Sequence, residues 1–216
     1  MCGIVGYIDR SGSVGPIGPT MLGMLDALGR RGPDSAGVAA YNPRGSSVRL
    51  RIKLGDQEAP EGRADAVISQ AATCADILQS SVTGSYLRIE ASFDGNPAEM
   101  ERTLEAVHPE IEVVSMGHSL EIVKQVDSPA NLDATYGVRE FTGTHAIGHT
   151  RLSTESKVDL SHSQPFWAHG TLDIAVVHNG HITNYHKLRR QYEMRGIRFY
   201  TENDSEIIGI YLKERM

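Results

Sequence analysis

The start of the chain offers a cysteine that could become an N-terminal nucleophile. The sequence begins Met1-Cys2-Gly3, and an initiator methionine is normally removed when a small residue follows it. Removal would leave Cys2 with both a thiol and a free α-amine, and an α-amine can accept a proton close to neutral pH. The amine could therefore act as the base that activates its own thiol, with no histidine required. Many proteins begin with Met-Cys by chance, so this segment predicts catalysis only together with the rest of an active site.

An apolar run that ends in His178-Asn179-Gly180 offers hydrogen-bond donors for a developing negative charge. The side chain of Asn179 has an amide NH₂ group, and the main-chain N–H of Gly180 is unobstructed. Such a pair can form an oxyanion hole for the tetrahedral intermediate of amide hydrolysis. An Asn-Gly pair is also common in hairpin turns. His178 lies inside the apolar run, and it is interpreted as a packed, hydrogen-bonded histidine rather than a base.

Two further segments carry charged groups next to apolar runs. Arg151 ends the stretch Gly148–Arg151, where its planar guanidinium suits fork-like binding of a carboxylate. The tight turn Arg30–Gly37 contains Arg31 and Asp34, which could support a nucleophile through an ion pair and hydrogen bonds. Each segment alone has an ordinary interpretation, either as a solvated arginine or as a polar turn that ends a helix.

Taken together, these segments resemble the glutaminase domain of the class II glutamine amidotransferases, which are N-terminal-nucleophile enzymes. Four motifs occur in the same order as in that family, and chance agreement of all four is remote. The resemblance extends to a loop before the Asn-Gly segment and to the start of the last helix. The matching stretches are Cys2–Gly6, Arg31–Gly37, His149–Arg151, Ser163–Phe166, His178–Gly180 and Asn203–Glu206.

The resemblance implies a role for each matched position. Cys2 would be the nucleophile and, through its amine, the general base and acid. Asn179 and Gly180 would form the oxyanion hole. Arg151 would bind the α-carboxylate of glutamine, and Asp204 would bind its α-ammonium group. This clamp of opposite charges would select a free amino acid over a peptide-bonded glutamine.

Two more residues receive supporting roles from the resemblance. Arg31 would lie near the nucleophile, and Thr154 would add a hydrogen bond beside the clamp. The sequence holds no cysteine cluster, dinucleotide fingerprint or flavin signature. We therefore expect no cofactor and no metal site in this chain.

Two features favour the glutamate-synthase-like branch of the family. Leu152 follows the clamp arginine where many members have an aromatic residue, and Glu155 stands where they have histidine or glycine. About 120 positions separate Arg31 from Arg151, more than the short members that make amino sugars or purines need. In that branch such a domain can be a separate subunit beside flavin and iron–sulfur partners, so any redox work would belong to a partner.

The composition excludes several classes of protein. The 216 residues are 40% hydrophobic and 22% charged, as in soluble globular proteins, and the net charge of −6 argues against nucleic-acid or membrane-surface partners. No apolar run is long enough to cross a bilayer, and the N-terminus lacks the features of a signal peptide. The two cysteines, Cys2 and Cys74, make neither a disulfide framework nor a zinc site. We therefore predict a cytoplasmic protein in which Cys74 is a small core residue.

The apolar periodicity predicts strands and helices in one domain over residues 1–216. The resemblance implies an α+β fold, a four-layer αββα sandwich with two antiparallel sheets between helices, and residues 56–126 as a small α+β insertion. The last predicted helix runs to Met216 without a capping glycine or proline, which leaves open that the chain is a fragment truncated at its C-terminus. Strands are expected at 3–8, 37–41, 48–54, 85–93, 111–116, 120–126, 146–150 and 172–177, helices at 20–31, 64–78, 97–107, 183–195 and 204–215, and a loop at 127–143.

Three functions are compatible with these residues. The leading hypothesis is a glutaminase module that hydrolyses the side-chain amide of L-glutamine and delivers ammonia to a synthase subunit or domain. An alternative is a stand-alone amidohydrolase with an N-terminal cysteine, which would not need opposite charges at both ends of its substrate. A non-catalytic regulatory subunit that keeps the fold is the third. Retention of the nucleophile, the oxyanion-hole pair and both clamp residues argues against this last hypothesis.

Overall fold

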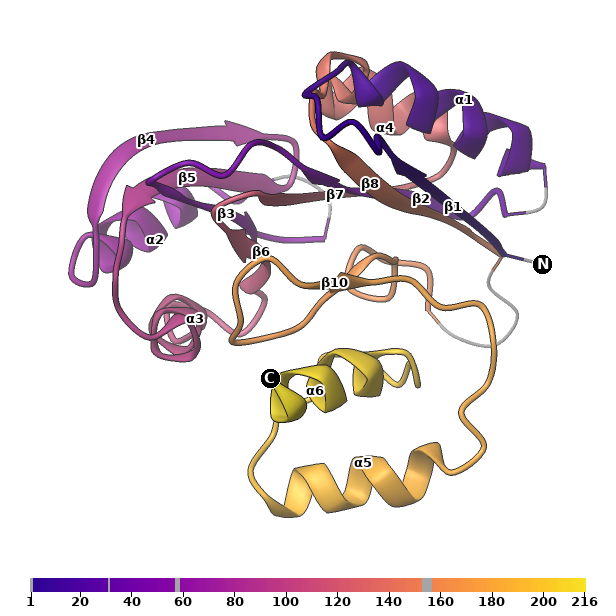
Figure 1. Ribbon diagram of the computed structural model, residues 1–216. Helices are drawn as coiled ribbons and strands as arrows, with labels where there is room; N and C mark the ends of the chain where they lie inside the picture. Colours follow the sequence, from indigo (N-terminus) through magenta and orange to yellow (C-terminus); the bar gives the residue numbers. More distant parts are fainter. Residues whose placement is uncertain (1, 31, 57–58, 153–156) are drawn as a thin grey trace.

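The computed structural model describes residues 2–30, 32–56, 59–152 and 157–216. These residues form two four-stranded sheets and one two-stranded sheet, all with antiparallel pairing, together with helices that pack on them (Figure 1). The α+β class predicted from the sequence is therefore confirmed.

The first sheet has the strand order β1-β8-β2-β7, so that β8 lies between β1 and β2. Its register pairs Gly3 with Thr150 and Ser35 with Arg151. The beginnings of β1 and β2 therefore both lie beside the end of β8. The strands span Gly3–Ile8 (β1), Ser35–Tyr41 (β2), Leu120–Val126 (β7) and His145–Arg151 (β8).

Helix α1 (Ile17–Gly29) covers one face of this sheet. Its residues Met21 and Leu25 are four positions apart and fully buried, as expected for a helix that turns one side to a sheet. The approach is close at the edge strand, since a Cβ atom on Gly3 would lie 2.7 Å from the Leu28 side chain. Only a glycine lets the first residue of β1 and the end of α1 pack in this way.

A second helix, α4 (Pro129–Tyr136), packs beside α1 on the same face (Figure 1). It begins with proline and is followed by Gly137 in the left-handed conformation, whose N–H donates to the carbonyl of Asp133. A short 3-10 helix then spans Val138–Glu140. The prediction of a loop over 127–143 is therefore wrong. The helix has only eight residues and little apolar periodicity, so the spacing of its apolar residues does not predict it.

The second sheet has the order β4-β5-β3-β6, and helices α2 and α3 pack against it. A buried apolar cluster joins this sheet to the first one through residues such as Ile52, Leu87 and Ile122. Helix α3 begins at an Asn96 cap, whose side chain accepts a hydrogen bond from the Ala98 N–H. The elements span Val48–Lys53 (β3), Arg63–Ala71 (α2), Asp76–Thr83 (β4), Tyr86–Ser92 (β5), Pro97–Glu105 (α3) and Glu112–Gly117 (β6).

The chain after α2 differs from the prediction of a helix over 64–78. Helix α2 ends at Ala71, and the Thr73 hydroxyl donates to the Gln70 carbonyl in the turn that follows. Cys74 is exposed, so the prediction of a core residue is also wrong. The next element, β4, is an edge strand with almost no buried side chains, and it therefore lacks the alternation that predicts a strand.

The strands between residues 56 and 126 are divided between the two large sheets. Strand β7 pairs with β2 in the first sheet, whereas β5 and β6 pair with β3, which precedes this segment. The extent of the insertion, 56–126, stays a prediction.

The last part of the chain lies on the side of the first sheet opposite α1 (Figure 1). It holds the two-stranded sheet β9 (Phe166–Trp167) and β10 (Ala175–Val176), followed by α5 (Tyr185–Met194) and α6 (Glu206–Arg215). The predicted strand 172–177 is thus shorter, and β9 was not predicted. The four-layer order and the C-terminal truncation stay predictions. Within the described ranges, no helix has the length and apolar character to cross a bilayer, and the cytoplasmic location stays a prediction.

Gly37 on β2 is expected to tolerate no side chain. A Cβ atom there would overlap the main-chain carbonyl oxygen of Gln164, in the loop that crosses this sheet. We expect Gly37→Ala to lower the free energy of unfolding by about 1 to 3 kcal/mol, as overpacking does. Gly6→Ala is the matched control in the same sheet, because a Cβ atom at Gly6 meets nothing within 4 Å. Equal urea midpoints for the two variants would contradict this packing.

Candidate active site

Cys2 lies directly before β1, and its thiol lies at the end of β8. The Leu152 N–H donates to Sγ over 3.4 Å, and Sγ lies 3.7 Å from the Leu152 carbonyl oxygen. Because Leu152 follows Arg151, these contacts put the predicted nucleophile beside the main chain of the predicted clamp arginine. The thiol is only partly buried, so a substrate can reach it.

The turn before β2 packs against the same strand end. The Asp34 N–H donates to the Arg151 carbonyl oxygen over 3.0 Å. A Cβ atom on Gly32 would lie 2.7 Å from the main-chain carbon of Thr150, so this approach requires glycine. The turn motif that ends at Gly37 and the His149–Arg151 motif therefore meet at the end of β8. Arg31, the supporting residue predicted in this turn, lies outside the described residues.

Asn179 brings the His178–Gly180 motif to the nucleophile. Its side-chain Nδ2 donates to the carbonyl oxygen of Cys2 over 2.9 Å, across 177 positions of sequence. Asn179 and Gly180 are both exposed. A Cβ atom on Gly180 would lie 2.7 Å from Nε2 of His178, so glycine keeps this turn compact. The predicted oxyanion-hole pair therefore lies next to Cys2.

Arg151 is buried, with 5% of its surface exposed, and its guanidinium is held from the following loop. Nη1 donates to the Lys157 carbonyl oxygen over 3.0 Å. Burial lowers the pKa of the Arg151 guanidinium, whereas the nearby acidic groups of Cys2, Asp159 and Asp34 act in the opposite direction. An arginine stays cationic under these conditions, and it can still attract a carboxylate. Thr154, which was predicted beside this clamp, lies outside the described residues.

Asp204 is held against the oxyanion segment. Its Oδ2 accepts a hydrogen bond from the Ile182 N–H over 2.6 Å, and its carboxylate lies 3.8 Å from Nδ1 of both His178 and His181. These contacts thus tie Arg151 to the nucleophile and Asp204 to the segment that contains Asn179. Each end of the predicted clamp is positioned by a different part of the site.

His149 is a buried histidine of this site whose role the sequence did not reveal. It lies two residues before Arg151 on β8, hence on the same face of the strand, and 2% of its surface is exposed. Neither ring nitrogen has a hydrogen-bond partner within the described part of the chain. Burial first, and then the electrostatic effects of Arg151 and His178, lower the pKa of His149 from 6.5 to about 4. The imidazole is therefore neutral at neutral pH.

A chain of contacts through His162, which no sequence motif predicts, joins the segment near Arg151 to the segment near Asp204. Asp159 accepts hydrogen bonds from the His162 N–H (2.8 Å) and from His162 Nδ1 (2.7 Å), and His162 Nε2 lies 3.2 Å from Glu202. Burial alone would raise the pKa of Asp159, but the bonds to His162 lower it well below its usual range. The His162 link therefore connects the loop that holds Arg151 to the loop that holds Asp204.

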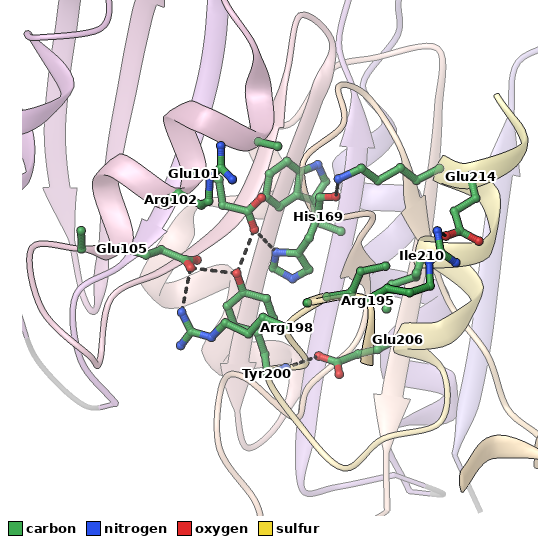
Figure 2. A pocket seen from close by; sticks show the side chains of 16 residues that line it. Glu101, Arg102, Glu105, His169, Arg195, Arg198, Tyr200, Glu206, Ile210 and Glu214 are labelled. Atoms are coloured by element: carbon green, nitrogen blue, oxygen red, sulfur yellow. Dashed lines mark hydrogen bonds and ion pairs between the residues drawn. The ribbon is translucent and has the colours of Figure 1, made fainter. Parts of the chain in front are cut away.

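A cavity of about 690 Å³ lies elsewhere, between α3, the end of β9 and α6 (Figure 2). Glu101, Glu105 and His169 offer atoms within 4.8 Å of one another that could in principle hold a metal ion. These groups already bond to one another, since His169 Nδ1 lies 2.6 Å from Glu101, and the Tyr200 hydroxyl lies 2.9 Å from Glu101 and 2.8 Å from Glu105. Of the predicted site residues that the structure describes, none lines this cavity.

Comparisons with known proteins agree with the motifs. Residues 136–215 match a family described as a glutamine amidotransferase domain. Over its whole length the chain is 36% identical to a protein of Methanothermobacter thermautotrophicus that carries a provisional glutamine amidotransferase name, and it covers 73% of that protein. It is 35% identical, again over its whole length, to the glutamine amidotransferase-like protein GlxB of Rhizobium meliloti, covering 70% of that protein.

A shorter match reaches a longer protein. Over 92 residues the chain is 38% identical to a glutamine–fructose-6-phosphate aminotransferase of Bradyrhizobium diazoefficiens. The matched region covers 43% of this chain and 15% of that enzyme. The matches define a glutamine amidotransferase domain. The chain belongs to the class II glutamine amidotransferase family, as its motifs predict.

Two histidines of the site are expected to titrate far apart. The folded pKa of His149 lies below the 6.5 of the unfolded chain, so only the unfolded chain takes up this proton as the pH falls from 6.5 to about 4. The resulting contribution to stability is present above pH 6.5 and is lost as the pH falls through that window. The hydrogen bond to Asp159 raises the pKa of His162, which is the internal control. Imidazole nitrogen NMR at pH 6 should show His149 neutral and His162 protonated, and an imidazolium at His149 would contradict this burial.

Proposed function

We propose that this chain is a glutaminase module in which Cys2 attacks the side-chain amide of L-glutamine. Two observations support the proposal. The chain belongs to a family of glutamine amidotransferases, and Asn179 donates a hydrogen bond to Cys2 itself. The second observation carries most weight, because it joins the predicted nucleophile to the predicted oxyanion donor. The products are glutamate and ammonia.

The chemistry begins only when Met1 has been removed, since the Cys2 nitrogen otherwise belongs to a peptide bond. The free amine then takes the thiol proton, and the thiolate adds to the side-chain carbonyl carbon of glutamine. The amine returns the proton to the leaving nitrogen, so that ammonia departs and a thioester remains. Water, activated by the same amine, hydrolyses the thioester to glutamate and restores the thiol.

Asn179 is suited to stabilise the oxyanion of the tetrahedral intermediate. An amide NH₂ group carries two N–H donors. One of them is used in the 2.9 Å bond to the Cys2 carbonyl oxygen, which fixes the orientation of the amide. The other N–H of Asn179 is then available for the oxyanion, together with the main-chain N–H of Gly180. Mutagenesis of such donors in other enzymes changes kcat by about 10²- to 10³-fold.

The ends of the substrate are recognised by opposite charges in this proposal. Arg151 binds the α-carboxylate, and its burial strengthens the attraction because little water competes there. Asp204 binds the α-ammonium group, while the Ile182 N–H holds its carboxylate in place. His149 stays neutral beside Arg151, so it adds no second positive charge to the carboxylate site.

Ammonia is delivered to a synthase partner in the full proposal. Leu152, Glu155 and the long separation of Arg31 from Arg151 favour a glutamate-synthase-like partner with flavin and iron–sulfur groups. Such cofactors would be held by that partner. Copurification of this chain with such a partner would identify the protein that receives the ammonia.

The clamp gives the direct kinetic test of the proposed function. The Met1-free chain should release ammonia from L-glutamine. Arg151→Gln and Asp204→Asn should each raise the KM for glutamine by about 30-fold or more, because loss of one partner of a desolvated charge pair costs about 2 to 5 kcal/mol. Arg190→Gln, at an exposed position of α5, is the control and should leave KM unchanged. Unchanged KM in both clamp variants would remove glutamine as the substrate and favour a stand-alone amidohydrolase.

A further inference from the structure

The side-chain amide of Gln164 makes two hydrogen bonds to the main chain of one other residue. Its Oε1 accepts from the His178 N–H over 2.7 Å, and its Nε2 donates to the His178 carbonyl oxygen over 3.0 Å. Gln164 is buried, with 5% of its surface exposed. His178 directly precedes Asn179 and Gly180, so these bonds act at the first residue of the predicted oxyanion segment.

These bonds replace the strand pairing that ends just before His178. Strands β9 and β10 are antiparallel, with Phe166 opposite Val176. Two residues further along this register, Gln164 lies opposite His178. The main chain forms no strand there, and the intervening Pro165 has no N–H to donate. The planar amide of Gln164 instead supplies one acceptor and one donor, which is what a neighbouring strand would supply.

Gln164 is itself fixed from two other directions. Its main-chain carbonyl lies so close to Gly37 of β2 that a Cβ atom on Gly37 would overlap it. Its Nε2 also lies 3.4 Å from Oγ of Ser205, and that hydroxyl lies 3.1 Å from Nδ1 of His178. Ser205 follows the clamp residue Asp204. Gln164 therefore connects three parts of the molecule: its main chain contacts the first sheet, and its side chain contacts the oxyanion segment and the residue after Asp204.

We propose that Gln164 is a positioning residue that holds Asn179 and Gly180 at the nucleophile. This inference rests on the proposed glutaminase function. In this role Gln164 acts through the main chain of His178. The pairing is rigid because both polar atoms of one amide are used on the same residue. Without it, the His178 N–H and carbonyl lose their partners, and the segment that carries the oxyanion donors can shift.

The first test compares Gln164→Met, which keeps the volume but removes both polar atoms, with the wild type. We expect kcat for glutamine to fall by about 10- to 100-fold, less than the roughly 10²- to 10³-fold for outright loss of an oxyanion donor, because the donors are displaced and not removed. The KM for glutamine should change by less than about threefold, because the Lys157 carbonyl holds the Arg151 guanidinium and the Ile182 N–H holds the Asp204 carboxylate. Alkylation of Cys2 by iodoacetamide needs the thiol but no oxyanion hole, and its rate should stay the same. Gln191→Met, at an exposed position of α5, is the matched control.

The second test uses the isosteric variant Gln164→Glu and its pH dependence. The introduced carboxyl can donate to the His178 carbonyl only while it is protonated. The ratio of variant to wild-type kcat should therefore fall as the pH rises from about 5 to 8, whereas the ratio for Gln164→Met should stay flat. A purely structural weakening of the fold would slow alkylation and kcat alike, and it would give no such difference between the two variants.

Hydrogen exchange of the His178 amide reports the positioning role without any catalysis. Gln164→Met should speed this exchange by at least about tenfold, since the His178 amide loses the side-chain oxygen that accepts its hydrogen bond. An active wild type with unchanged kcat in Gln164→Met would overturn the inference, and so would an unchanged exchange rate. A wild type that releases no ammonia would instead overturn the proposed function, while exchange would still decide whether Gln164 holds the segment.

Discussion

The antiparallel pairing of β1 with β8 is the constraint on which the rest of the site depends. It joins the first residues of the chain to a strand about 150 positions later, with Gly3 opposite Thr150. Because strand pairing fixes the main chain on both sides, Cys2 can lie only beside the end of β8, where Leu152 donates to its thiol. A slip of one residue would turn Arg151 to the opposite face of the sheet, away from the predicted substrate. The glycines at positions 3 and 32 let α1 and the turn before β2 pack closely around this junction.

The other half of the site is assembled by side chains more than by strands. Strands β9 and β10 are only two residues long each, so few main-chain bonds align the loop from Lys157 to Ile182. Hydrogen bonds of charged and polar side chains align this loop instead. The Arg151 guanidinium donates to the Lys157 carbonyl, His162 bonds to the Asp159 carboxylate, and the Ile182 N–H donates to the Asp204 carboxylate. Partly buried bonds of this kind are costly to leave unmade, because a lost partner leaves a desolvated polar group unpaired. The same bonds that hold the loop therefore also fix the geometry of the site.

The sequence predicts the parts of this molecule that leave a local trace. Buried strands such as β1 and β8 are apolar runs, and helix α1 has its apolar residues at helical spacing, so their positions agree with the structure. Strand β4 was missed because its side chains are exposed and only its main chain is paired. Helix α4 was missed because it is short and buries few side chains, although Pro129 and Gly137 mark its ends.

The residues of the candidate site also divide into those that the sequence reveals and those that it does not. Cys2, Arg151, Asn179, Gly180 and Asp204 were found because their residue types suit a specific chemistry at the ends of apolar runs. His149 and Gln164 were missed as working parts, since their roles come from contacts with residues distant in sequence. The bonds from Gln164 reach Ser205 and His178, and the environment of His149 is set by burial and by Arg151 and His178. No local periodicity encodes such contacts, so the sequence alone could not reveal them.

The central claim is that Cys2 becomes the nucleophile once Met1 has been removed, and intact-mass measurement tests it most directly. Purified protein is treated with a glutamine analogue that carries an electrophile in place of the side-chain amide. The account predicts one adduct on the Met1-free chain, located at Cys2, with Cys74 unmodified although it is exposed, and no adduct on chains that retain Met1. A Met1-free chain that gains no adduct, or one that reacts equally at Cys74, would contradict the account.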